Sequence, residues 1–442
     1  MNFKPKMTFS QIINMNVGFL GIQYSFGLQQ SAVNPIYDML GASPDEIPIL
    51  NLAGPLTGLI IQPIIGALSD KTWSDRWGRR KPYFLIGAIL CSITLLIYPF
   101  SSSLWMAAGL LWILDAGNNT AMEPYRAFIA DNLDTKQQGL GFQAQSFFTG
   151  LGQTLANLSL FIFPLLFTGY LGKLPTWVYA SFFLGAFCSI ASILWSLKTT
   201  KEIPPDAAEL ERIRNANHGF LSPFVEIFGA IKDMPRVMWQ LSLVYLFQWY
   251  ALFCYWQNSS KSVALSVWNA TPGSDPQRYE EAVSWTGLIN GWYNIVTFLT
   301  AFLLARLASQ YSPKWVHIIC LLLAATGFLF FPWLSNKYLL IVAITGFGIG
   351  WASMMGIPYL MVVSEIPKER YGVYMGIINM MIVLPMILQN VTFGYILEHF
   401  LHNDSRLAIT FAGVLLILAA IATALITVKK GEKVNTILPT SH

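Results

Sequence analysis

The chain consists of long apolar segments separated by short polar ones. A helix needs about 20 apolar residues to cross the hydrocarbon core of a membrane, and twelve segments of this sequence reach that length. The pattern predicts an all-α membrane protein with twelve transmembrane helices. We expect these helices at residues 11–33, 49–69, 83–101, 104–128, 140–168, 176–197, 237–258, 284–307, 315–333, 338–362, 373–397 and 406–428.

The composition supports this class, and the distribution of basic residues orients the helices. Only 11% of the residues are charged, against about 25% in soluble domains. Loops rich in Lys and Arg face the cytoplasm. With alternate loops assigned to the two sides, 21 of the 27 Lys and Arg residues fall on the side of the N-terminus. Five, including Lys261, fall on the other side, and Arg126 lies within a span. We therefore expect a multi-pass protein of the plasma membrane, or of the inner membrane in a Gram-negative cell, with both termini cytoplasmic.

A long hydrophilic stretch at residues 198–236 divides the spans into two groups of six. The two halves also resemble each other. Pro124 is followed seven residues later by Asp131, and Pro358 is followed at the same spacing by Glu365, each near the end of the fourth span of its half. Such matches indicate an internal repeat. We expect an N-terminal six-helix bundle at residues 1–197, a cytoplasmic linker at 198–236 and a C-terminal six-helix bundle at 237–442.

The fourth span is unusual because it carries charged residues. Asp115, Glu123 and Arg126 lie inside or at the end of this apolar stretch, and charges at membrane depth are costly and usually functional. Eleven residues at roughly 100° each bring Arg126 to within about 20° of the face of Asp115, about 16 Å along the axis. Asn119 lies close to the same stripe. This stripe should face water or substrate rather than lipid.

The loop after the second span carries a recognisable motif. It reads GALSD at residues 66–70 and, after an insertion at 71–74, DRWGRRKP at 75–82. With twelve spans split six and six, this loop resembles that of the major facilitator superfamily. The resemblance implies two six-helix bundles around a central cavity. It also implies a conformational latch between the halves; the alternative is that the loop is a simple positive-inside anchor. The latch residues would be Asp70, Arg76, Arg79 and Arg80.

Three segments narrow the resemblance. DRWGRRKPY, WILDAGNNTAMEPYRAFIAD and YGVYMGIINMMIVLPMILQN are similar to those of sucrose-transporter-type carriers, within the glycoside–pentoside–hexuronide cation symporters, here in a bacterial-type member. The resemblance implies that Asp115 couples transport to protons and that Arg126 acts in substrate binding or coupling. Glu123 departs from the plant members, which are uncharged there, so either acid could titrate. Glu123 could also pair with Arg126, and a static charge network that only fixes helix packing is the alternative.

Sugar binding requires amides and carboxylates for the hydroxyl groups and flat aromatic rings for the CH faces. Polar residues at helix depth supply candidates, although many such amides only bond neighbouring helices and many Trp residues only anchor the interface. The candidate substrate-binding residues, besides Arg126, are Gln30, Asn119, Gln145, Asn290, Asn379 and the platform Trp249.

These observations predict a proton-coupled importer of a small glycoside, such as the α-linked disaccharides maltose or sucrose, that works by alternating access. Sodium coupling is the first alternative, but span 49–69 contains no acid before Asp70. A non-transporting membrane receptor or scaffold is the second. An efflux carrier for hydrophobic compounds is the third, disfavoured by the many amides in the spans.

The sequence gives no support for other chemistries. We find no phosphate-binding loop, catalytic triad or metal-ligand spacing, and the four cysteines are scattered in apolar runs. The net charge of +4 follows from the topology and does not indicate nucleic-acid binding. We therefore expect no enzymatic activity, no cofactor and no bound metal. The expected partners are a sugar, protons and the lipid bilayer, and we expect a monomer.

Overall fold

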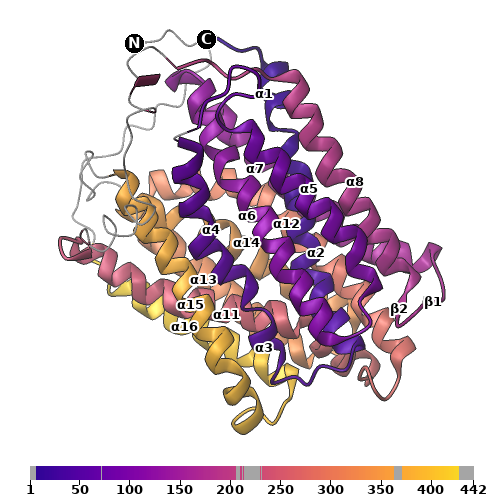
Figure 1. The fold of residues 1–442 in the computed structure, drawn as a ribbon. Coiled ribbons are helices and arrows are strands. Elements are labelled where there is room, and N and C mark those ends of the chain that lie inside the picture. The colour runs from indigo at the N-terminus through magenta and orange to yellow at the C-terminus, as the bar shows by residue number, and fades with distance from the viewer. Residues whose placement is uncertain are drawn as a thin grey trace.

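The fold is described from a computed structural model. The structure describes residues 6–70, 72–205, 231–362 and 371–427, together with residues 210, 211, 213 and 229. Helices grouped by colour in Figure 1 form two bundles, one from each half of the chain. This arrangement is the expected one, and the long apolar helices explain it because every backbone polar group must be satisfied within the membrane.

The first bundle runs from α1 to α8. Two of its spans are interrupted: α1 and α2 together form the first, and α3 and α4 together form the second. A short hairpin of two antiparallel strands, β1 and β2, joins α7 to α8. The elements are α1 (Phe9–Asn16), α2 (Gly18–Met39), α3 (Ile47–Leu50), α4 (Ala53–Asp70), α5 (Lys81–Ile97), η1 (Tyr98–Phe100), α6 (Leu104–Asn132), α7 (Thr135–Leu166), β1 (Tyr170–Leu171), β2 (Leu174–Pro175) and α8 (Thr176–Thr199).

The second bundle repeats the pattern. A single π-helical segment, η2, extends its first helix, and a short 3-10 turn, η3, follows its third. The elements are α11 (Arg236–Val263), η2 (Ala264–Trp268), α12 (Pro276–Gln310), α13 (Pro313–Phe330), η3 (Phe331–Trp333), α14 (Lys337–Val362), α15 (Tyr371–His399) and α16 (Ser405–Ala424).

Nine helical segments within the described residues are apolar enough to cross a membrane by composition alone. The three other long helices, α2, α6 and α12, are more polar because they carry amides and charged residues along their length. A membrane span tolerates such residues where they face the protein interior or a water-filled cavity. The three polar helices therefore identify the part of the protein that faces away from lipid.

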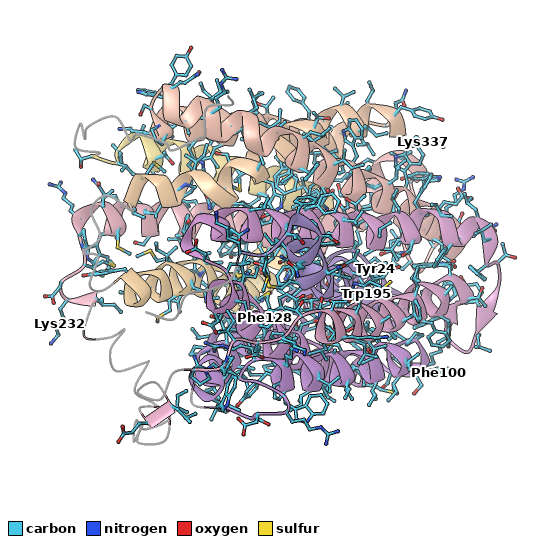
Figure 2. All side chains as sticks on the ribbon, turned by 90° about the horizontal axis from the view of Figure 1, so that it is seen from above. Tyr24, Phe100, Phe128, Trp195, Lys232 and Lys337 are labelled. Atoms are coloured by element: carbon cyan, nitrogen blue, oxygen red, sulfur yellow. The ribbon has the colours of Figure 1, made fainter. Side chains whose placement is uncertain are left out.

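The two ends of the molecule are distinguished by the linker. We call the end at which α8 ends and α11 begins the linker end, and the opposite end the far end. Figure 2 shows Lys232 at the linker end, with Phe100 and Lys337 at the far end. The turn between α2 and α3 and the β1–β2 hairpin also lie at the far end (Figure 1).

Glycine allows close contact between helices within each bundle. A Cβ atom at Gly87 of α5 would lie 2.6 Å from the carbonyl oxygen of Gly117 in α6. A Cβ atom at Gly346 of α14 would lie 2.4 Å from the carbonyl oxygen of Leu323 in α13. Small residues let membrane helices pack at such distances, so backbone-to-backbone contacts hold the helices together within each bundle.

Candidate functional site

A cavity of about 830 Å³ lies between the two bundles. Such a volume is typical of small-molecule sites. Its walls come from α2, α4, α6 and α7 of the first bundle and from α11, α12, α14 and α15 of the second. Seven of the predicted site residues line it: Gln30, Asp115, Asn119, Arg126, Gln145, Trp249 and Asn379.

Asp115 lies in the middle of α6 and is 97% buried in the wall of this cavity, with 3% of its surface exposed. It faces α4 where that helix has a glycine: a Cβ atom at Gly54 would lie 3.5 Å from Oδ2 of Asp115. Within the described residues no Lys, Arg or His forms an ion pair with Asp115. The cavity therefore contains a carboxylate without a permanent counter-ion.

Asn119, one turn after Asp115, is already hydrogen-bonded within the first bundle. Its Nδ2 donates to Oγ1 of Thr57 at 3.0 Å and to the carbonyl oxygen of Asp115 at 2.9 Å, and its Oδ1 accepts from Nε2 of Gln62 at 2.6 Å. These bonds join α6 to α4 beside the carboxylate. Asn119 thus holds the helix segment that carries Asp115, and only its cavity-facing edge is available to a ligand.

Arg126 and Glu123 do not form the ion pair that their spacing suggested. The Arg126 side chain is exposed and lines the cavity. Glu123 is half-buried and does not line the cavity; its Cγ lies beside Gly66 of α4, 3.6 Å from where a Cβ atom would stand. No ion pair joins the two side chains in the part of the chain described. Glu123 is directed toward α4 and Arg126 toward the cavity, so Arg126 remains available to a ligand.

The second bundle contributes an aromatic wall. Trp351 of α14 meets Trp249 of α11 edge to face, with ring centroids 5.6 Å apart, and meets Trp256 in the same way at 5.5 Å. All three line the cavity. Sequence reasoning chose Trp249 but missed Trp351, because a Trp in an apolar run is more often an interfacial anchor. Only the position of Trp351 near the middle of its span distinguishes it from an interfacial Trp.

Three buried donors in the cavity wall have no hydrogen-bond partner among the described residues. They are Nε2 of Gln29 and Nε2 of Gln145 from the first bundle and Nε1 of Trp249 from the second. A buried polar group without a partner is costly, so these donors are suited to a ligand that supplies acceptor oxygens. The cavity thus offers hydrogen bonds from both sides.

Asn290 is not among the residues that line the cavity, in contrast to the prediction. Its Nδ2 donates to Oγ of Ser31 at 2.9 Å, and its Oδ1 accepts from the Tyr255 hydroxyl at 2.9 Å. Ser31 in turn donates to Oδ1 of Asn157 at 2.5 Å. The amide is therefore used in a network that joins α12 to α2 and α7, as many membrane amides are.

The far end of the cavity is closed by a buried ion pair that sequence reasoning missed. Nζ of Lys261 in α11 lies 2.6 Å from Oδ1 of Asp38 in α2. The Tyr279 hydroxyl of α12 donates to Oδ2 of Asp38 at 2.5 Å. The charge count placed Lys261 in an external loop, but α11 continues to Val263 and buries it. The only sequence signal was an acid, Asp38, just beyond the predicted end of the first span.

Backbone contacts complete the closure. Nδ2 of Asn34 donates to the carbonyl oxygen of Trp256 at 3.3 Å, and Nδ2 of Asn390 donates to that of Asn51 at 3.3 Å. A Cβ atom at Gly394 would lie 2.3 Å from the carbonyl oxygen of Asp45, so α15 touches the turn between α2 and α3 through bare backbone. Both bundles contribute to every one of these contacts.

The cavity is open toward the linker end. At its far end the lining residues are buried: Asn34 and Gln257 are each 4% exposed. Toward the linker end the lining residues Phe147 and Met355 are 42% and 45% exposed, and Arg126 is exposed as well. The cavity is therefore closed at the far end and accessible from the linker end.

The predicted latch loop holds the first bundle together in this state. Nε of Arg80 contacts Oδ2 of Asp131 at 2.8 Å, at the end of α6. The Glu202 carboxylate at the start of the linker accepts from the backbone N–H groups of Arg79 and Arg80, which precede α5, and of Lys81, its first residue. Sequence reasoning missed Glu202. Arg76 is exposed, and the side chain of Asp70 lies outside the described residues.

Comparison with known proteins agrees with this geometry. The sequence matches the family described as Major Facilitator Superfamily over residues 15–389 and again over 262–439. It is 24% identical over 440 residues to sucrose transport protein SUT5 of Oryza sativa subsp. indica, covering 85% of this chain and 79% of that protein. It is 25% identical over 421 residues to sucrose transport protein SUC4 of Arabidopsis thaliana, covering 85% and 81%.

Solved structures share the fold. The nucleoside transporter NupG aligns with a TM-score of 0.69 at 14% identity, covering 95% of this chain and 99% of that one. The xylose transporter XylE from E. coli, in an inward open conformation, aligns with a TM-score of 0.67 at 15% identity, covering 96% and 98%. With its two bundles, its central cavity and this match along most of its length, the chain belongs to the Major Facilitator Superfamily of membrane transporters.

Proposed function

We propose that this transporter imports a small glycoside, an α-linked disaccharide such as maltose or sucrose, together with a proton. One observation carries the proposal: a buried carboxylate, Asp115, is the only acid among the described lining residues of a cavity whose two walls offer amide and indole donors. The names of the plant relatives support the choice of sugar.

Proton coupling follows from the isolation of Asp115. Burying a charged carboxylate without a counter-ion is costly. Water in the open cavity relieves that cost, and protonation relieves it when the cavity closes around substrate and dries. A sugar-loaded carrier built in this way closes readily only when the carboxylate is neutral, whereas the empty carrier keeps water around the ionised carboxylate and can return without a proton. The proton therefore moves with the sugar.

Binding at both walls would link sugar to closure. A disaccharide that reaches from Gln145 and Arg126 to Trp249 and Asn379 contacts both bundles, so it binds the closed state better than either open state. Only such a difference in affinity shifts the conformational equilibrium. A single hexose ring spans less of the cavity and therefore shifts the conformational equilibrium less.

We place the linker end in the cytoplasm, in line with the basic residues of its loops, and the protein in the plasma membrane as a monomer with both termini inside. In this orientation the structure is the inward-open state, in which sugar and proton leave. The Asp38–Lys261 pair must then separate before the cavity opens outward.

The test is uptake of labelled maltose or sucrose by proteoliposomes under an imposed pH gradient or an imposed sodium gradient. We expect accumulation with the pH gradient alone. Accumulation with the sodium gradient alone would favour the sodium-coupled alternative. Sugar binding without accumulation under either gradient would favour a receptor. If glucose competes as well as the disaccharides, the proposal that a two-ring sugar is needed to contact both bundles fails.

A further inference from the structure

A second cavity, of about 640 Å³, lies at the far end of the molecule and shares no lining residue with the central one. We call it the interfacial pocket. One wall is formed by α7, the β1–β2 hairpin and α8, and the other by η2, α12 and the start of α14. Its volume is typical of small-molecule sites. Aromatic side chains dominate it: Phe161, Phe167, Tyr170, Trp177, Trp268 and Trp285.

The water-facing part of the interfacial pocket is acidic. Glu280 accepts hydrogen bonds from Nε1 of Trp177 at 3.1 Å and from the Tyr170 hydroxyl, and Glu281 accepts from Nε1 of Trp268 at 3.0 Å. A carboxylate offers about four acceptor positions, so each can accept more. Neither forms an ion pair with a Lys or Arg among the described residues. Burial raises the pKa of Glu280 to about 7, as expected for an acid without a nearby cation.

The deeper part of the pocket carries one positive charge. Nζ of Lys337 lies 4.6 Å from the ring centroid of Trp285 and 5.4 Å from that of Tyr338. Trp285 follows Glu281 by one helical turn, about 6 Å further along α12 into the membrane. The ammonium of Lys337 has no carboxylate partner within the described part of the chain. The carboxylates of Glu280 and Glu281 thus lie nearer the water, and the ammonium of Lys337 lies deeper, toward the bilayer.

One edge of the pocket is continuous with the lipid-facing surface. Leu165, near the end of the apolar span of α7, lines the pocket and is 71% exposed. Phe161, one turn deeper, also lines it and is half-buried. Trp and Tyr side chains are enriched where a membrane meets water. The pocket is therefore open both to the headgroup layer and to the acyl chains.

We propose that the interfacial pocket binds an aminophospholipid of the far-end leaflet, with its primary ammonium on Glu280 and Glu281, its phosphate on Lys337 and an acyl chain along Phe161 and Leu165. The order of charges matches such a lipid, whose ammonium lies on the water side of its phosphate. A primary ammonium donates hydrogen bonds to both carboxylates. A choline headgroup has no N–H group to donate, so it is left with Coulombic and cation–π contacts, and a glycerol headgroup brings no positive charge.

Binding there would favour the state seen in this structure. The pocket is walled by both bundles, and Glu280 of α12 bonds across them to Trp177 of α8. Opening the far end separates these walls. A lipid that fits only the closed far end therefore shifts the population toward the state open at the linker end.

The test uses the purified full chain, stripped of lipid in detergent, and native mass spectrometry with ethanolamine, choline and glycerol phospholipids of identical acyl chains. We expect the ethanolamine lipid to bind about tenfold more tightly than the glycerol lipid, the scale of a charge-assisted hydrogen bond. Glu280→Gln with Glu281→Gln should remove this preference. The matched control is Glu398→Gln, an exposed far-end glutamate outside the pocket, which should keep it.

A second variant separates the two charge contacts. Lys337→Gln should weaken retention of all three lipids while preserving the ethanolamine preference. If the double glutamate variant does not fold, Glu281→Gln alone, at an exposed position, should reduce the preference several-fold. Equal binding of ethanolamine and glycerol lipids would overturn the proposal, as would a preference that survives the glutamate changes. Displacement of lipid by maltose or sucrose would instead identify a sugar site.

Discussion

The two bundles have similar helical frameworks, but they contribute different chemistry to the central cavity. Among the described lining residues, the charged ones, Asp115 and Arg126, both belong to the first bundle. The second bundle contributes amides and the aromatic wall around Trp249 and Trp351. The repeat in the sequence aligns Arg126 with Leu360. This asymmetry supports the proposal that the first bundle handles the ion, while the second supplies the aromatic part of a sugar site that both walls share.

The largest effect should come from the charge in the first bundle. Asp115→Asn removes the group that exchanges a proton, so accumulation driven by a pH gradient should fall to the level of passive equilibration. Exchange of labelled for unlabelled sugar should persist, because the amide retains the shape and most hydrogen bonds of the carboxyl. Both are measured in proteoliposomes. Accumulation at the wild-type level would show that Asp115 does not couple transport to protons, and it would contradict the proposal that the first bundle handles the ion.

The next effect concerns the contact that joins the bundles at the far end. Asp38→Asn leaves Lys261 buried without its anion, which is strongly destabilising. The population open at the far end should rise by roughly 5- to 150-fold, the usual range for a conformational coupling. Labelling of Phe253→Cys in the cavity by an impermeant thiol reagent from the far side reports this opening.

The double variant Asp38→Asn with Lys261→Gln should label more slowly than the single variant, since no buried charge is left unpaired. Asp404→Asn serves as control, because Asp404 pairs with Arg406 within one bundle at the same end. If the single variant labels no faster than this control, the Asp38–Lys261 pair does not hold the far end closed.

In the second bundle, Trp249→Ala should raise the apparent KM for sugar about 30-fold, the scale of losing a central aromatic contact. The ratio of protons to sugar should stay the same, because the coupling acid lies on the other wall. Trp249→Phe keeps a ring and loses only the indole donor, so its effect should be smaller. A changed proton-to-sugar ratio in either variant would contradict the separation between the bundles.

The smallest of these effects should come from Arg126→Lys, which keeps the charge but loses the planar fork that binds two oxygens at once. We expect apparent sugar affinity to fall roughly 5- to 10-fold. Equilibrium binding to the purified protein measures it. If sugar affinity and transport rate both equal those of the wild type, only the positive charge of Arg126 matters and its planar fork does not bind the sugar.

The sequence predicted the spans well because the hydrocarbon core imposes length and apolarity on each helix. It also pointed to Asp115 and Arg126, because charge at membrane depth is conspicuous. It could not predict that Asp38 meets Lys261, since the two lie more than 200 residues apart and are brought together only when the bundles meet.

Amides were harder to assign than charges. Asn290 and Asn379 are equally polar in the sequence, yet only Asn379 lines the cavity while Asn290 bonds Ser31 and Tyr255. Which face of a span meets the cavity depends on the packing of both bundles. Weak amphipathicity in these helices leaves that face undefined until the fold is known.

Sugar-driven proton uptake is the most direct test of the central claim that one carboxylate of the first bundle couples transport. Proteoliposomes without any imposed gradient receive maltose or sucrose while external pH is recorded, for the wild type, Asp115→Asn and Glu123→Gln. Because Glu123 lies outside the cavity lining, we predict alkalinisation with the wild type and Glu123→Gln, and none with Asp115→Asn. Alkalinisation by Asp115→Asn together with its loss in Glu123→Gln would contradict the account and transfer the coupling role to Glu123.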